Sequence, residues 1–145
     1  MSSAPQIRYP DCYGIDMSRM DEFIAFRALV DLLKENNKEY LIRETYEKCK
    51  SQEHLPAKEV KNEVQTLYNQ FTYQEITDKI AELVTPKNIN VKVEVIYQTV
   101  ENLHKAIPNH PGDWYFSGDY PTPGGFKVVN KAFINFIEGK KGRSY

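Results

Sequence analysis

Apolar residues at helical spacing are the feature that most constrains this chain. Between Met20 and Leu33 they recur three and four residues apart, which places them on one face of a helix. Ser18 is a good N-cap before this stripe, and Asn36 and Asn37 are typical residues for the stop. The stripe consists of Met20, Phe23, Ile24, Phe26, Val30 and Leu33. A face of this kind has to be buried, so we expect a packed domain rich in helix.

A second helix has a clear start signal. Thr72 is followed three residues later by Glu75, the pattern of a capping box, and Phe71 and Ile76 occupy the positions of a hydrophobic staple. We expect this helix to end at residues 85–86, which read Thr-Pro. We also expect helices over residues 99–107 and 126–138. The charged stretch 38–70 has narrow apolar stripes, which also predict helix.

Two segments predict short strands. Residues 90–97 alternate Val91, Val93, Val95 and Tyr97 with more polar neighbours, and alternation is typical of a strand with one buried face. Residues 6–9 form a second candidate in the Pro-rich opening. The expected fold class is therefore mixed α/β (an α+β fragment), dominated by helix, with two or three short strands.

Composition excludes several classes of protein. The 145 residues amount to about one domain, and 19 Lys and Arg against 20 Asp and Glu give a net charge of −1. This balance argues against a nucleic-acid binder, and no apolar run has the length of a membrane helix. Two cysteines, Cys12 and Cys49, cannot form a disulfide scaffold. The N-terminus lacks the pattern of a secretory signal, so we expect a cytoplasmic protein.

Local motifs indicate no catalytic residue and no metal site. His54, His104 and His110 lack the spacing of zinc ligands, and no phosphate-binding glycine loop is present. Asp16 could bind a cation or a sugar hydroxyl, or it could hydrogen-bond amides of its own loop. Gly124 and Gly125 could bind an anion before the last helix, although a turn is the commoner role.

An aromatic cluster follows the third histidine. It could be a stacking platform for bases or sugars, but without a basic groove that role is weakly indicated. The alternative is that the rings fasten a long loop to the core. The cluster consists of Trp114, Tyr115, Phe116 and Tyr120.

Three stretches of the chain resemble the amidophosphoribosyltransferase family. Residues 3–18 read Ser-Ala-Pro-Gln-Ile-Arg-Tyr-Pro-Asp-Cys-Tyr-Gly-Ile-Asp-Met-Ser and are followed by Glu22-Phe-Ile-Ala. Residues 95–107, Val-Ile-Tyr-Gln-Thr-Val-Glu-Asn-Leu-His-Lys-Ala-Ile, are similar to a strand and helix near the C-terminus of that family. Residues 116–122, Phe-Ser-Gly-Asp-Tyr-Pro-Thr, resemble a motif close to its end. The order of the three stretches is the same as in the family.

The resemblance implies a C-terminal segment of a phosphoribosyltransferase-type domain. The parent enzyme of de novo purine biosynthesis moves the glutamine amide nitrogen onto phosphoribosyl pyrophosphate and forms 5-phosphoribosylamine. The parent enzyme has a nucleophilic cysteine and a paired-acid loop that binds the substrate and magnesium. Neither has a counterpart in this sequence. The segment is therefore expected to be non-catalytic. Tyr13, Gly14 and Asp16 are the residues expected nearest to substrate.

The same resemblance bears on cofactors. In some members of the family an iron–sulfur cluster has a ligand at the position of Cys12. The two later cysteines of that set have no equivalent in residues 109–115, which read Asn-His-Pro-Gly-Asp-Trp-Tyr. We therefore expect no cluster and no cofactor held by this chain.

The expected organisation has four parts. Residues 1–37 end the phosphoribosyltransferase-like region, 38–70 form a helical insertion, 71–138 form a C-terminal helix–strand–helix region, and 139–145 are a flexible tail. The expected partners are the remainder of the parent enzyme, its other subunits, or further copies of this chain. The alternative is an independent helical protein-interaction module.

Overall fold

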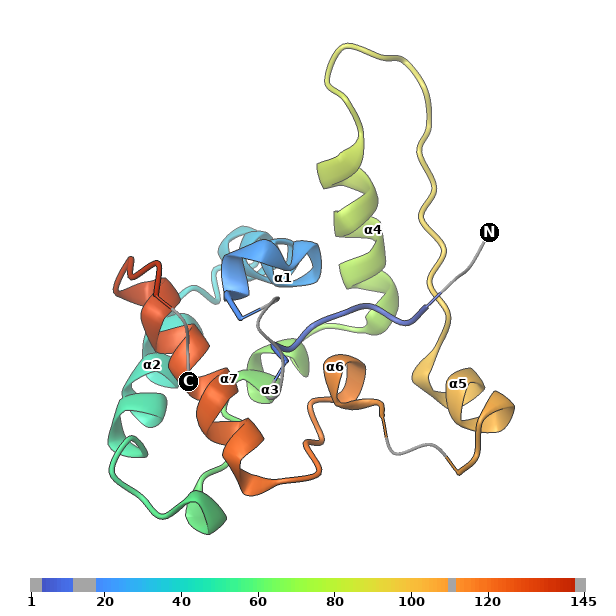
Figure 1. The fold of residues 1–145 in the computed structure, drawn as a ribbon. Coiled ribbons are helices and arrows are strands. Elements are labelled where there is room, and N and C mark those ends of the chain that lie inside the picture. The colour runs from blue at the N-terminus through green and yellow to red at the C-terminus, as the bar shows by residue number, and fades with distance from the viewer. Residues whose placement is uncertain (1–3, 12–17, 110–111, 143–145) are drawn as a thin grey trace.

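The computed structural model of the chain describes residues 4–11, 18–109 and 112–142 (Figure 1). Two short 3₁₀ turns and seven α-helices occur within these ranges. In chain order they are η1 (Met20–Glu22), α1 (Ile24–Glu35), α2 (Tyr40–Ser51), η2 (Ala57–Glu59), α3 (Val64–Tyr68), α4 (Tyr73–Val84), α5 (Val100–Ala106), α6 (Trp114–Ser117) and α7 (Pro123–Ile137).

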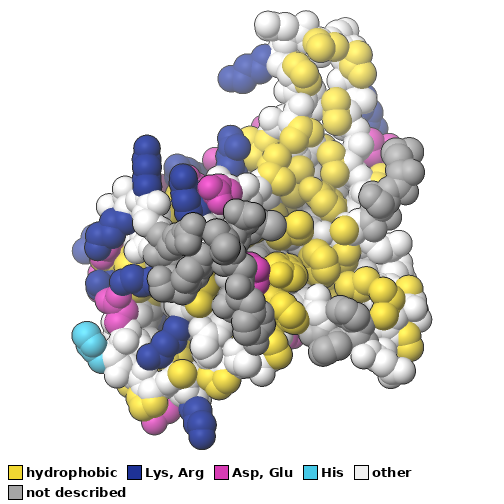
Figure 2. Space-filling model, in the orientation of Figure 1, with side chains coloured by type: hydrophobic (Ala, Val, Ile, Leu, Met, Phe, Trp, Pro, Cys, Tyr) yellow, Lys and Arg dark blue, Asp and Glu magenta, His cyan; other side chains and the backbone are white. Residues whose placement is uncertain are grey.

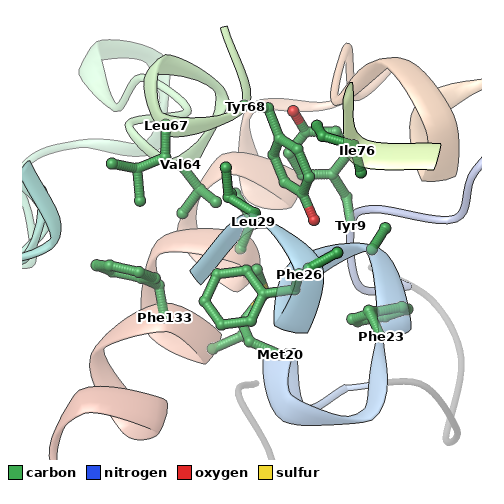
Figure 3. Close-up of a cluster of buried hydrophobic side chains, with 14 of the residues drawn as sticks. Tyr9, Met20, Phe23, Phe26, Leu29, Val64, Leu67, Tyr68, Ile76 and Phe133 are labelled. Atoms are coloured by element: carbon green, nitrogen blue, oxygen red, sulfur yellow. The ribbon is translucent and has the colours of Figure 1, made fainter. Parts of the chain in front are cut away.

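Helix α1 lies at the centre of the hydrophobic core. It packs against α4, while α2 packs against α7 (Figure 1). Phe26 and Leu29 of α1 are fully buried, and the ring of Phe26 meets that of Phe133 edge-on at 6.0 Å (Figure 3). This edge-to-face geometry is one that aromatic pairs favour. Of the apolar stripe read from the sequence, Met20, Phe23, Phe26 and Leu33 are buried in the core, while Ile24 and Val30 pack against it and are only partly buried.

The charged stretch between α1 and α4 contributes to the same core. Cys49 of α2 is buried, as are Val64, Leu67 and Tyr68 of α3. Figure 3 shows Val64, Leu67 and Tyr68 beside Leu29. Residues 38–70 are thus packed against the rest of the described chain through a few large side chains.

The expected start of α4 is confirmed. The Thr72 hydroxyl accepts from the amide of Glu75, and the Glu75 carboxylate accepts from the amide of Thr72. Each partner satisfies an amide that a helix start leaves without an intrahelical acceptor.

Two other helix starts differ from expectation. Helix α1 begins at Ile24 with Phe23 at the N-cap, because the 3₁₀ turn η1 intervenes after Ser18. Helix α7 begins at Pro123, three residues before the expected start. Proline suits the first turn because its missing amide would have no partner there.

The expected α/β class is wrong. The residues that the structure describes contain no β-strand, and all regular structure among them is helical. Residues 6–9 are extended, but their amides donate to Tyr73 and to the carbonyl of Tyr115 instead of to a strand. Residues 90–97 are also extended and have no neighbouring strand within the described chain. The side-chain pattern of these segments therefore indicated which side is buried. It did not indicate pairing with another strand.

A helix that crosses a bilayer needs both length and apolar character. None of the helices among the described residues combines the two.

Replacing a buried residue of α4 tests the position of the core. Ile76→Ala is expected to lower the free energy of unfolding by about 2–5 kcal/mol, because the fully buried side chain leaves a cavity. Leu83→Ala, near the exposed end of the same helix, is expected to cost less than about 1 kcal/mol. Urea denaturation followed by circular dichroism measures both values. Equal losses would contradict the burial of this face of α4.

Candidate functional site

An extended N-terminal segment, residues 4–10, crosses the helices and is held by side chains. Gln6 is buried, and its amide donates to the hydroxyl oxygen of Tyr73 over 2.6 Å. Its side-chain nitrogen donates to the hydroxyl of Thr77 over 2.7 Å. Both partners belong to α4, so this helix fixes the start of the segment.

Arg8 strengthens the same attachment. Its guanidinium lies 4.8 Å from the centre of the Tyr68 ring and 4.9 Å from that of Tyr73. Its nitrogens also donate to the side-chain oxygen of Gln6 over 2.8 and 3.0 Å. Two aromatic faces and a carbonyl oxygen therefore compensate the partial loss of water around this charge.

Tyr9 follows Arg8 and is almost completely buried. Its ring packs at 5.3 Å from that of Tyr68, and both rings are buried (Figure 3). Burial raises the pKa of the Tyr9 phenol well above its usual range, so the group is neutral at physiological pH. Tyr9 thus acts as an apolar anchor of the segment.

The loop after α6 closes over Tyr9. Gly118 has φ +81°, and a Cβ atom there would lie 2.8 Å from the Tyr9 ring. Only glycine satisfies both the left-handed backbone and this close approach. The amides of Arg8 and Tyr9 both donate to the carbonyl of Tyr115 just before this loop.

Tyr120 holds the end of the segment. Its hydroxyl donates to the carbonyl of Pro10 over 2.6 Å, and the ring is buried. A Cβ at Gly125 would lie 2.3 Å from this ring, so the start of α7 also requires glycine. The expectation that aromatic residues fasten the loop to the core is confirmed at Tyr120 and Trp114.

The three stretches that carry the family resemblance come together at residues 4–10. The first stretch contains this segment, and the third contains Gly118 and Tyr120, which contact it. The second stretch joins them through Gln98. The backbone amide of Gln98 donates to the carbonyl of Ala4 over 3.2 Å, and its backbone carbonyl accepts from the hydroxyl of Tyr73 over 3.0 Å. Stretches about 90 to 110 residues apart in sequence therefore form one assembly.

The expected substrate-proximal residues lie outside this description. Tyr13, Gly14 and Asp16, together with Cys12, fall in the range 12–17 that the structure does not describe. The described residues on either side are Asp11 and Ser18, and Ser18 is buried.

The described histidines form no metal site. His104 contacts Asp113 over 2.8 Å and is more than half exposed, and no group of three potential ligands occurs among the described residues. His110 lies outside them.

A separate pocket of about 270 Å³ lies between α2 and α7. Its lining includes Cys49, Glu53, Lys127 and Lys131, and Glu53 pairs with Lys131 over 2.8 Å. Burial, followed by the charges of Glu63 and Glu53, raises the pKa of the Cys49 thiol to about 12. A thiol in this state is a poor nucleophile.

Sequence reasoning did not identify Arg8 or Gly118 as anchoring residues. No spacing rule could have done so, because their partners come from distant parts of the chain. The sequence did place both residues inside the stretches that resemble the family.

Comparison with known proteins gives one informative similarity. A 34-residue segment of the chain is 56% identical to part of the amidophosphoribosyltransferase of Haemophilus influenzae. The match covers 23% of this chain and 7% of that enzyme, so the chain spans only a small part of the curated relative. No protein-family model and no solved structure matches the chain.

Removing one hydroxyl tests the anchoring of the N-terminal segment. Tyr120→Phe is expected to lower the free energy of unfolding by about 1–2 kcal/mol, because the buried carbonyl of Pro10 loses its partner. The amides of Arg8 and Tyr9 should exchange with deuterium at least about tenfold faster. Tyr40→Phe, an exposed change on α2, is the matched control. Unchanged exchange in Tyr120→Phe would contradict the anchoring role.

The reactivity of Cys49 tests its burial. In a Cys12→Ala background, the single remaining thiol is expected to react with a disulfide reagent at pH 8 at least about 100-fold more slowly in the native than in the unfolded protein. The raised pKa disfavours the thiolate at every pH below about 12, so the native rate should still be rising above pH 9. Equal native and unfolded rates would show that Cys49 is accessible.

Proposed function

We propose that this chain is the C-terminal structural segment of an amidophosphoribosyltransferase-like enzyme and contains none of its catalytic residues. The observation that carries the proposal is the meeting of the three family-like stretches at residues 4–10. The 34-residue similarity to a known amidophosphoribosyltransferase supports the same relationship. The parent reaction would transfer the glutamine amide nitrogen to phosphoribosyl pyrophosphate, with magnesium held by the remainder of the enzyme.

The role of the segment would be to position Tyr13, Gly14 and Asp16, the residues expected nearest to substrate. The chain before residues 12–17 is held by Tyr9 and by the contact from Tyr120 to Pro10. The chain after them leads directly into η1 and α1, whose residues Met20 and Phe26 lie in the core. The described chain is therefore held in place on both sides of residues 12–17.

A mixing experiment tests this function. The remainder of the parent enzyme, expressed without this segment, is assayed for formation of phosphoribosylamine from ammonia, with and without residues 1–145. We expect activity only after mixing, because the segment completes the transferase domain. Glutamine-dependent activity should return in parallel.

A variant pair separates positioning from simple binding. Asp16→Asn is expected to reduce kcat/KM of the mixture at least about tenfold without weakening association of the two polypeptides, whereas Asp31→Asn on α1 should leave both near the wild-type values. Full activity without the segment would contradict the proposal. It would favour the alternative of an independent protein-interaction module.

A further inference from the structure

The chain between α4 and α5 exposes an extended backbone. Residues 90–97 run beside α4, and within the described part of the chain their amides and carbonyls make no hydrogen bond (Figure 1). The first contact of this kind comes at Gln98, which bonds to Ala4. An extended segment with free backbone donors and acceptors is a template for pairing with another strand.

The two faces of the segment differ in burial. Val95 and Tyr97 pack on the hydrophobic core, while Ile96 on the opposite face is 77% exposed. Ile89 and Val91 are also exposed, at 54% and 59%. Figure 2 shows hydrophobic side chains reaching the surface over the upper part of this side of the molecule, where α4 and the segment lie. Apolar surface of this extent around an open backbone edge indicates an interface.

The segment is complementary to itself. In an antiparallel pair centred on Val93, Lys92 of each copy faces Glu94 of the other. Each of these charges therefore lies opposite a charge of the other sign. Neither residue forms an ion pair within the described part of its own chain. The same register places Val91 opposite Val95, Ile89 opposite Tyr97 and Asn88 opposite Gln98, so three further pairs match in polarity. The remaining pair, Asn90 with Ile96, sets an amide opposite an apolar side chain.

Neighbouring registers are worse. A pair centred on Lys92 brings two lysines together, and one centred on Glu94 brings two glutamates together, and like charges directly opposite destabilise a pair. A register shifted by one residue in the pairing would set the apolar face of one copy against the polar face of the other. Of these neighbouring registers, the one centred on Val93 avoids both defects and also pairs opposite charges.

We propose that residues 88–98 form a two-stranded antiparallel ribbon with the same residues of a second copy of this chain. Each monomer remains helical, and the ribbon exists only between the two copies. The face with Val95 and Tyr97 stays against the hydrophobic core in both copies, since all odd-numbered side chains lie on one side of the ribbon. The inference is independent of the function proposed above.

Charge reversal tests the proposed register. Lys92→Glu and Glu94→Lys should each weaken the dimer about tenfold or more, because each creates two like-charge contacts related by the two-fold axis. The double variant K92E/E94K restores opposite charges and should return the dissociation constant to within about threefold of the wild type. Analytical ultracentrifugation of residues 1–145 measures all four proteins. Lys105→Glu, on exposed α5, is the matched control and should have no effect.

A cysteine pair provides a second readout that does not depend on charge. In a Cys12→Ala background, Val93→Cys should form a disulfide-linked dimer on mild oxidation, since residue 93 faces its own copy. Val91→Cys should not, because the two residues 91 would lie four residues apart along the ribbon, about 13 Å. A chain that stays monomeric at about 100 μM overturns the proposal. So does a double charge variant that fails to recover, or equal cross-linking at positions 91 and 93.

Discussion

The packing of Tyr9 between Tyr68 and the backbone of Gly118 is the contact on which the rest of the structure depends. It joins an extended N-terminal segment, the helical stretch before α4 and the loop before α7. None of these elements could bury its apolar surface alone. The neighbouring hydrogen bonds from Tyr68 to the carbonyl of Arg8 and from Tyr120 to that of Pro10 satisfy backbone groups that the same packing removes from water.

Helices were predictable because their signals are local. The apolar stripe from Met20 to Leu33 spans about four helical turns and the capping box of α4 about one, and the structure contains both. The start of α1 was not predicted, although Ser18 is a good capping residue. Burial of Met20 and Phe23 favours a 3₁₀ turn there, and that burial depends on α7, which packs on η1. Local signals identified the helices, while tertiary packing determined where one of them begins.

The strand prediction failed for a related physical reason. Alternating side chains require only that one side of an extended segment is buried, and Val95 and Tyr97 meet that requirement by packing on the core. A strand also needs a partner for its backbone groups, and the side-chain pattern contains no information about that partner. The same limit applies to the anchoring site. Arg8 and Gly118 lie within recognisable stretches, but their contacts with Tyr73 and Tyr9 arise only in the folded chain.

The extended segment also has a thermodynamic consequence. In a single chain, water satisfies the backbone groups of residues 90–97, so the absence of a partner costs little hydrogen-bond energy. The exposed apolar side chains Val91 and Ile96 do cost free energy, and a second chain would remove part of them from water. The equilibrium between the single chain and the paired chains therefore depends on protein concentration, as in any association. Because the amide of Gln98 at the end of this segment donates to the carbonyl of Ala4, a paired segment would also restrict the extended residues that begin at Ala4.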